Sequence, residues 1–502
     1  MTSAWQSLFL LFSVLFIIYH LISARFRWIL LLISSLFFLF VVSGPLCFIY
    51  TIIFVFISFL GAYLIDKVKE DRIKFEILTL TVVTLFMGLL IFKFTNVIIP
   101  VNVFISKFFN IPRQFVNSII IPVGISYYTL ILIAYVVDVY RKVTVIEKNF
   151  FKYLLFTIYF PQLLMGPIVR HNDTKEQLIS QKPIDFSYIQ FGILRILWGI
   201  TKKIVIADRL AIITNQIFSN YSALPNTYII SAIVLFTLQL YIDFSSAMDI
   251  GLGISSCLGI KLPENFNNPF FSRSYHQFWQ RWHITIFTFY RDYIFYPVIR
   301  SKFVKKIKTV LERYPKINSK HIPIFIAYIF VFIFAGVWHG GDSRAMLGNC
   351  LLPCIYLMIE DIFHYPLKKI YNRYKFIQKN IFYSIFQMIG VFILFCICVL
   401  FFAVQSVNEG FSIISQCFFY FNIENGFKII LMKDLCIVIF GLLAVLVVDI
   451  LKENKIDIKN FYITKIPVIL HWCIISAFIS IIILFGLYGP NYSPTDFVYF
   501  KF

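Results

Sequence analysis

Apolar runs of about 20 residues, the length that crosses a bilayer as a helix, recur along almost the whole chain and constrain its fold more than any other feature. Twelve such stretches begin near Trp5, Trp28, Leu46, Phe75, Ile119, Phe150, Tyr228, Ile322, Met346, Ile381, Ile429 and Ile466. Backbone polar groups inside a bilayer must be hydrogen-bonded internally, so these stretches are expected to be helices. The sequence therefore predicts an all-α polytopic membrane protein with roughly a dozen spans.

The composition agrees with this prediction. Of the 502 residues, 60% are hydrophobic and only 14% are charged, a balance that soluble domains do not show. The net charge of +20 lies mainly in short segments between apolar runs, which indicates the positive-inside rule rather than nucleic-acid binding. The nine cysteines lack metal-ligand spacing with histidine and are interpreted as small buried hydrophobes. We expect no metal and no permanently bound cofactor.

Basic segments predict the orientation of the helices. Residues 300–320 hold eight Lys or Arg against one Glu, and residues 368–379 hold five against none, so both are expected in the cytoplasm. Two spans join them, so the turn around His339 is expected to lie at the outer side or to dip inward from it. The same parity sends the tail Tyr488 to Phe502 outward. The first apolar stretch, Trp5 to Ile22, is followed by two arginines and is expected to be a retained helix with its N-terminus outside.

Two segments are too polar to span alone. Residues 186–209 and 263–300 carry charges and large rings between the apolar stretches. Irregular backbone at membrane depth is tolerated only where protein or a water-filled cavity surrounds it. We therefore expect these segments to be interfacial or re-entrant, inside a shell of helices.

Two histidines are candidates for chemistry. His339 lies in Trp338-His339-Gly340-Gly341, where a titratable ring sits between apolar stretches and the glycines leave room for a substrate near the backbone. Its bland alternative is a histidine at a helix end. His283 closes the segment Phe278 to His283, and a reaction-site role stands evenly against a buried histidine that is hydrogen-bonded for structure.

Two aspartates interrupt the apolar stretch that begins near Tyr228. Asp243 and Asp249 are about 600° apart around a helix and so lie on different faces, which argues against a shared-proton pair. Buried carboxylates require compensation, and Arg281 and Arg291 are the expected partners. Structural pairing is the favoured role over substrate contact.

Ordered motifs carry a family resemblance. From about residue 120 to 345, and again at the very end, the chain resembles the membrane-bound O-acyltransferases, in particular the bacterial branch that O-acetylates alginate and peptidoglycan. The motifs are Pro122-Val123-Gly124-Ile125-Ser126-Tyr127, Asp138-Val139-Tyr140-Arg141, Phe160-Pro161-Gln162 with Gly166-Pro167-Ile168, Lys202-Lys203 with Ala207-Asp208, Asp243-Phe244-Ser245, Pro263-Glu264-Asn265-Phe266-Asn267-Asn268-Pro269-Phe270, Phe278-Trp279-Gln280-Arg281-Trp282-His283, Arg291-Asp292-Tyr293 and Val337-Trp338-His339-Gly340.

The resemblance implies a helical shell around a central tunnel, with His339 as the catalytic histidine and His283 as the second signature histidine. The chain also departs from the alginate-type pattern. It has Val298-Ile299-Arg300 where Leu-Gly-Gly is usual, and Phe401-Phe402-Ala403 lacks an arginine often found nearby. These departures bear on the acceptor glycan rather than on the reaction class. The residues predicted to contact the substrate or line the tunnel are Asp243, Ser246, Asn265, Asn268, Arg281, Trp282, Trp338 and Gly340.

The chemistry expected of such a tunnel is acyl transfer. A thioester made in the cytoplasm crosses lipid poorly, so a tunnel would accept the donor from inside and present its acyl carbon to an acceptor from outside. His339 is expected to act as general base on the acceptor hydroxyl. Asn265, Asn268 and Trp338 are candidate donors to the developing oxyanion.

The terminal segment Phe497 to Phe502 has two interpretations. Its aromatic rings suit an interfacial anchor. It also resembles the C-terminal tail of bacterial acyl-relay systems, in which Tyr499 matches a tyrosine that carries the acyl group. On that interpretation a partner SGNH-type transferase outside the membrane completes delivery.

The predicted function is O-acetylation of peptidoglycan or another cell-surface or exported polysaccharide, with acetyl-CoA as donor, by a multi-pass protein of the bacterial cytoplasmic membrane. The alternatives are D-alanyl transfer to teichoic acids and, in a different class, a substrate transporter. The predicted organisation is N-terminal membrane helices at 1–118, a catalytic core at 119–365, C-terminal membrane helices at 366–487 and an outer tail at 488–502.

Overall fold

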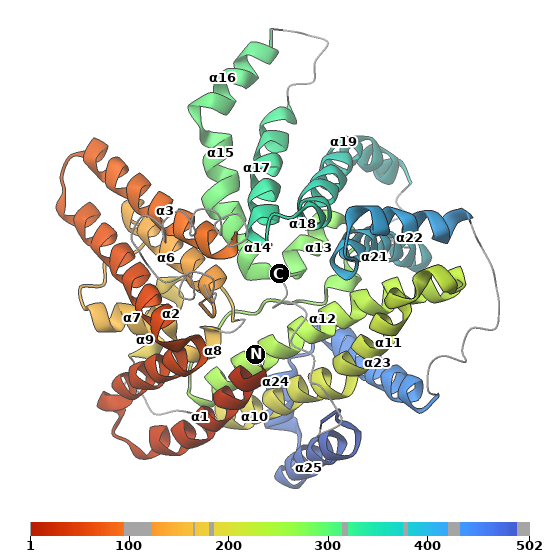
Figure 1. Ribbon diagram of the computed structural model, residues 1–502, viewed down its shortest axis with the longest axis horizontal. Coiled ribbons are helices and arrows are strands. Elements are labelled where there is room, and N and C mark those ends of the chain that lie inside the picture. Colours follow the sequence, from red (N-terminus) through yellow and green to blue (C-terminus); the bar gives the residue numbers. More distant parts are fainter. Residues whose placement is uncertain are drawn as a thin grey trace, which may run out of the picture. The chain divides into compact units, whose positions relative to one another are not determined.

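The computed structural model describes residues 2–94, 122–163, 166–179, 185–313, 320–374, 380–419 and 432–488. These residues are mainly helical and contain no strand (Figure 1), although one isolated antiparallel bridge joins Phe266 and Trp282. Seven of the described helices are long and apolar enough to cross a membrane, and three shorter apolar helices accompany them. The prediction of an all-α polytopic membrane protein is confirmed.

The predicted apolar stretches do not map one to one onto these helices. The stretches near Trp28 and Leu46 form a single helix, α2 (Arg27–Lys67), with a kink at Gly44, whose φ is 77°. Glycine tolerates this angle, and Pro45 lacks the N–H of a regular helix, so the helix bends there without ending. The stretch near Phe150 is a helix of only 9 residues. The seven long helices are Ala24–Lys67, Asp71–Lys93, Asn226–Cys257, Ser343–His364, Ile381–Ala403, Asp434–Glu453 and Val468–Phe485.

The chain divides into two compact units. Unit 1 comprises Met1–Ile196 and Met248–Pro263, and unit 2 comprises Leu197–Ala247 and Glu264–Phe502. The helices that begin in unit 1 are α1 (Thr2–Leu21), η1 (Ala24–Phe26), α2, α3 (Asp71–Lys93), α6 (Ile125–Tyr140), α7 (Phe150–Ile158), α8 (Phe160–Leu163), α9 (His171–Leu178) and α10 (Phe186–Ile200).

Small residues let the helices of unit 1 approach closely. A Cβ at Gly61 would lie 2.4 Å from the Thr81 hydroxyl, and one at Gly88 would lie 2.1 Å from the Phe54 ring. Between α2 and α7, Ser58 and Tyr153 share a buried hydrogen bond of 2.7 Å. Close backbone approach and interhelical polar contacts are how membrane helices pack without a hydrophobic driving force.

Unit 2 holds both candidate histidines, His283 and His339. Its helices are η2 (Thr201–Ala207), α11 (Asp208–Ser219), η3 (Tyr221–Ala223), α12 (Asn226–Cys257, which ends in unit 1), η4 (Pro269–Phe271), α13 (Tyr275–Arg281), α14 (Ile284–Tyr290), η5 (Arg291–Phe295), α15 (Tyr296–Arg300), α16 (Lys302–Leu311), α17 (Ile322–Trp338), α18 (Ser343–Ala345), η6 (Met346–Leu351), α19 (Leu352–Arg373), α21 (Ile381–Ala403), α22 (Val407–Phe419), α23 (Met432–Glu453), α24 (Ile458–Lys465) and α25 (Val468–Phe485). Of these, η2, η5 and η6 are π-helices, a form often found at functional sites.

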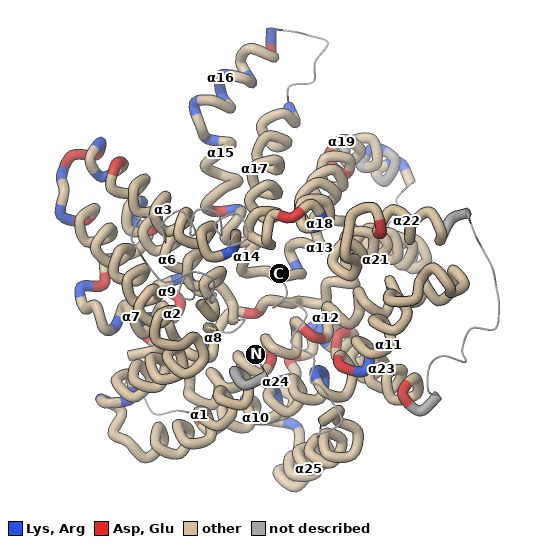
Figure 2. Tube along the Cα trace, viewed as in Figure 1, with Lys and Arg blue, Asp and Glu red and all other residues tan. Residues whose placement is uncertain are grey.

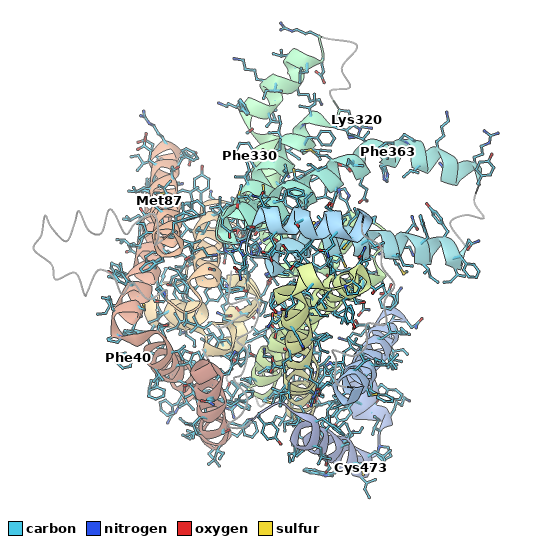
Figure 3. All side chains as sticks on the ribbon, turned by 45° about the vertical axis from the view of Figure 1, so that its right-hand side comes forward. Phe40, Met87, Lys320, Phe330, Phe363 and Cys473 are labelled. Carbon is cyan, nitrogen blue, oxygen red and sulfur yellow. The ribbon has the colours of Figure 1, made fainter. Side chains whose placement is uncertain are left out.

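Many apolar side chains point away from the interior of the protein. Phe40 and Met87 in unit 1, and Phe330 and Phe363 in unit 2, are each about half exposed and project outward (Figure 3). Charged residues are sparse along most long helices but dense on α16 (Figure 2). Exposed apolar side chains on apolar helices are expected to face lipid.

Six of the nine cysteines are buried, as predicted. The prediction fails for Cys436 and Cys473, which are exposed. Both lie on helices of spanning length and composition. An apolar stretch does not reveal which of its residues face lipid and which face protein.

Candidate functional site

His283 and His339 line the same pocket of unit 2. Its walls come from α13, α14, α17, η6 and α21, and its lining also includes Trp279, Tyr290 and Asn349. The cavity volume is about 50 Å³. The two histidines are far apart in the chain, so only the packing of these helices brings them together.

Local backbone geometry places His339. Its N–H donates to Ala335 at 3.0 Å as α17 ends, and the chain then turns through Gly340 and Gly341. The φ angles of these glycines are 118° and 67°, values that residues with a Cβ rarely adopt. The Gly-Gly pair therefore ends the helix and leaves the half-buried imidazole at its tip.

Polar contacts hold the turn after His339 in place. The Asp342 carboxylate accepts a hydrogen bond from the Ala345 N–H at 2.8 Å and so caps the next helix. Arg344 pairs with Asp342 at 2.7 Å and also donates to the Val404 carbonyl oxygen at 2.7 Å. Near the end of α17, a Cβ at Gly336 would lie 2.7 Å from the Met346 sulfur, so α17 and η6 are closely packed.

His283 sits at the junction of α13 and α14. It is 2% exposed, and its backbone is left-handed with φ 46°, an uncommon conformation for a residue with a side chain. Asn265 holds the start of α14, because its carbonyl oxygen accepts from Ile284 N–H and its side-chain oxygen accepts from Thr285 N–H and hydroxyl. The motif around Asn265 thus supports the histidine that it precedes in the chain.

A second contact anchors the same junction. Arg281 donates to both carboxylate oxygens of Glu453, at 2.8 and 3.2 Å, and to the Asn268 carbonyl oxygen at 3.3 Å. Asn268 donates its side-chain amide to Glu453 at 3.3 Å. A bidentate pair of this kind fixes orientation as well as position.

Aromatic rings surround both imidazoles. Trp338, which is 2% exposed, lies 4.7 Å from the His339 ring and 6.4 Å from the His283 ring. The Phe244 ring contacts His283 edge-on at 4.8 Å. Burial lowers the pKa of His283 to about 3, so its imidazole is neutral near pH 7.

The aspartates of α12 are paired, but not with the expected arginines. Asp243 accepts from Lys203 at 2.8 Å, and Asp249 accepts from Arg195 at 2.8 Å. Arg281 pairs with Glu453, and Arg291 pairs with its neighbour Asp292. The predicted Arg281 and Arg291 partners are therefore wrong, because the cations come from the preceding helical segment. Structural pairing of Asp243 agrees with the favoured prediction.

The structure brings together only part of the predicted set. His283, His339 and Trp282 line the pocket. The remaining predicted residues that the structure describes are not among its lining residues: Asp243, Ser246, Asn265, Asn268, Arg281, Trp338 and Gly340. Tyr499 lies outside the described residues.

Three polar lining residues were missed as candidates: Trp279, Tyr290 and Asn349. Trp279 lies inside a recognised motif, although only its neighbours were singled out. Asn349 carried no sequence signal beyond its position shortly after His339.

The comparisons with known proteins agree with these motifs. The model of the membrane-bound O-acyltransferase family matches residues 78–311. A "probable alginate O-acetylase" of Azotobacter vinelandii is 30% identical over 67% of this chain and 64% of its own length. The peptidoglycan O-acetyltransferase of Helicobacter pylori is 28% identical over 50% of this chain and 49% of its own. The teichoic acid D-alanyltransferase of Bacillus subtilis is 26% identical over 57% and 69%.

The match thus spans less than two thirds of the Azotobacter relative. The family model's match, residues 78–311, contains the motifs from Pro122 to Tyr293. The resemblance to the alginate and peptidoglycan O-acetyltransferase-like branch is confirmed. The chain belongs to the membrane-bound O-acyltransferase family.

Proposed function

We propose that the protein is a membrane O-acyltransferase that passes an acetyl group from a cytoplasmic thioester, acetyl-CoA, toward peptidoglycan or another cell-surface or exported polysaccharide. One observation carries the proposal: His283 and His339 line one small pocket. By the same measure of volume, one water needs roughly 10–15 Å³. A cavity of about 50 Å³ therefore suits a group of a few atoms, such as an acetyl group, better than a long acyl chain.

The placement of His339 supports its role as general base. Its ring is half-buried at the end of α17, whereas the basic helix α16 precedes the start of α17. A 17-residue helix is about 25 Å long, so the imidazole and the basic segment are separated by most of a bilayer core. With α16 in the cytoplasm, His339 meets an acceptor from the outer side. His283, neutral and buried, contributes an uncharged imidazole beside the reacting groups.

The acceptor is proposed to be Tyr499, which hands the acetyl group to an SGNH-type transferase outside the cytoplasmic membrane. Replacing Tyr499 by Phe keeps the ring and removes only the hydroxyl. We expect Tyr499→Phe to abolish glycan acetylation, and mass spectrometry of the wild-type C-terminal peptide to find an acetyl group on Tyr499. Full glycan acetylation by Tyr499→Phe would reduce the tail to an aromatic anchor.

The similarity to a teichoic acid D-alanyltransferase supports a second candidate function, transfer of D-alanine from a phosphopantetheine carrier. The donor distinguishes the two. Membranes that contain the protein are incubated with labelled acetyl-CoA or with the labelled aminoacyl carrier, and label is followed into protein and glycan. We expect label from acetyl-CoA, and label from the carrier alone would overturn the acetyl proposal.

A further inference from the structure

Two N–H groups of the pocket are buried without a partner. The indole Nε1 of Trp279 and the side-chain Nδ2 of Asn349 are both inaccessible to solvent, and neither has a hydrogen-bond partner in the part of the chain that the structure describes. Both residues line the pocket that contains His283 and His339. An unsatisfied buried donor costs about 1–3 kcal/mol, so two in one small pocket need a physical reason.

The fold holds both donors firmly. Trp279 stacks on Phe287 with ring centroids 4.3 Å apart, and its ring also lies 5.2 Å from that of Phe278. Asn349 lies in the π-helix η6. A Cβ at the preceding Gly348 would lie 2.7 Å from the Cys398 carbonyl oxygen, so η6 rests directly on the α21 backbone. Close packing of Trp279 on its aromatic neighbours and of η6 on α21 therefore positions both donors at the pocket.

The chemistry of the two groups indicates what they bind. An indole nitrogen can only donate, and both groups are uncharged. The lining residues of this pocket include no lysine or arginine. Neutral, preorganised donors gain most when charge appears on their acceptor during the reaction rather than before it. A thioester carbonyl oxygen is such an acceptor.

We propose that Trp279 and Asn349 form the oxyanion hole of the acyl transfer, an assignment that rests on the proposed function. The acceptor hydroxyl oxygen bonds to the acyl carbon while its proton passes to the His339 imidazole. The carbonyl π pair moves onto oxygen, which receives hydrogen bonds from Nε1–H of Trp279 and Nδ2–H of Asn349. The pair then re-forms the carbonyl, the C–S bond breaks, and the leaving thiolate takes the proton from His339.

The test removes each donor with little change of shape. Asn349→Leu and Trp279→Phe are assayed in membranes with labelled acetyl-CoA. Loss of one oxyanion donor is expected to lower kcat on the order of 10²-fold with little change in KM, because the bond is made in the transition state. A matched control is Asn226→Leu, which removes a buried amide bonded to the Gln416 carbonyl oxygen at 2.9 Å outside the pocket. This control is expected to keep its kcat per folded molecule.

A second acyl donor distinguishes a catalytic role of the two N–H groups from a structural role. In the dithioester analogue of acetyl-CoA, sulfur replaces the carbonyl oxygen and accepts hydrogen bonds weakly. If the two N–H groups serve that oxygen, the difference between wild type and each variant shrinks to a few-fold with the dithioester. If the two side chains have only a structural role, their loss slows the reactions of acetyl-CoA and of the dithioester by the same factor. That result would overturn the oxyanion hole.

The outcomes also separate this inference from the proposed function. A variant with wild-type kcat in active membranes overturns the oxyanion hole alone and leaves acyl transfer standing. Wild-type membranes that transfer no acyl group from a thioester overturn both. Should Asn349→Leu fail to accumulate, Trp279→Phe carries the same comparison of donors, since its smaller ring keeps the stacking partner.

Discussion

Two clusters of buried polar residues in unit 2 differ in how many of their hydrogen-bonding groups are paired. In the first, the Lys203 ammonium lies 2.9 Å from Asp208 and 2.8 Å from Asp243, and the neighbouring Lys202 donates to Ser245 at 2.7 Å. In the second, which includes Trp279 and Asn349, two buried donors have no partner among the described residues. We call the first cluster, Lys202, Lys203, Asp208, Asp243 and Ser245, the ion network. We call the second, Trp279 and Asn349 together with His283 and His339, the pocket group.

The difference in pairing indicates a structural role for the ion network and a chemical role for the pocket group. Burial alone lowers the pKa of Lys203, but Asp243 and Asp208 outweigh it and raise the pKa above its ordinary value, so the amine stays charged. A buried charge that is paired on two sides holds helices together and has little capacity left for a substrate. Donors that the protein leaves unpaired are available to a reacting group. The following variants test whether this division holds.

The largest expected effect is on the pocket side. His339→Ala removes the proposed general base, and a general base contributes typically ~10²–10⁴-fold to a rate. We therefore expect loss of acyl transfer of that order, measured as label transferred from acetyl-CoA per folded molecule.

The matched control is His364→Ala, at an exposed histidine on α19, which is expected to leave transfer unchanged. Unchanged transfer by a well-folded His339→Ala would defeat the catalytic role of the pocket. It would also revive the alternative of a substrate transporter.

The ion network is expected to affect stability instead. Lys203→Met removes the ammonium that pairs with the buried carboxylates of Asp208 and Asp243, and removing one partner of a buried ion pair costs about 3–5 kcal/mol of folding free energy. Thermal unfolding in detergent should show this loss, while the protein that remains folded keeps its transfer rate. Lys308→Met is the control, since its ion pair with Glu312 is about half exposed and such pairs contribute about 0–1 kcal/mol. A lower rate in folded Lys203→Met would break the division between the two groups.

The smallest expected effect concerns pH. His276 faces Glu360 at 3.2 Å, Asp361 at 3.6 Å and the Tyr328 hydroxyl at 2.8 Å. Burial lowers the pKa of His276, but the two carboxylates outweigh it and raise the pKa above 6.5. Because the folded state favours the protonated form, the stabilisation is complete below about pH 6.5 and declines as pH rises through the folded pKa.

Unfolding midpoints measured between about pH 6 and 8 should therefore fall more for the wild type than for His276→Gln. The partly exposed pair should make this a small difference. If the unfolding midpoints of the two proteins change in parallel with pH, His276 is not the source of the pH dependence.

The amino-acid sequence alone predicts the helical membrane fold, because long apolar stretches have no other stable form in lipid. It also determined the turn at His339, since Gly340 and Gly341 permit the backbone angles that end α17 there. Ordered motifs then predicted His339 as the catalytic histidine and His283 as the second signature histidine. Each of these signals is local, carried by a short run of residues and the backbone it forms.

The partners of the buried polar groups depend on tertiary packing and could not be predicted from local sequence. Asp243 pairs with Lys203 rather than with Arg281, and Arg281 pairs with Glu453, which lies on a helix far along the chain. Asn349 lines the pocket from η6, a π-helix that packs on α21, and no neighbouring residue in the sequence predicted this position. Pairing and burial depend on which helix faces lie together, and an apolar stretch specifies that it is a helix without specifying its neighbours.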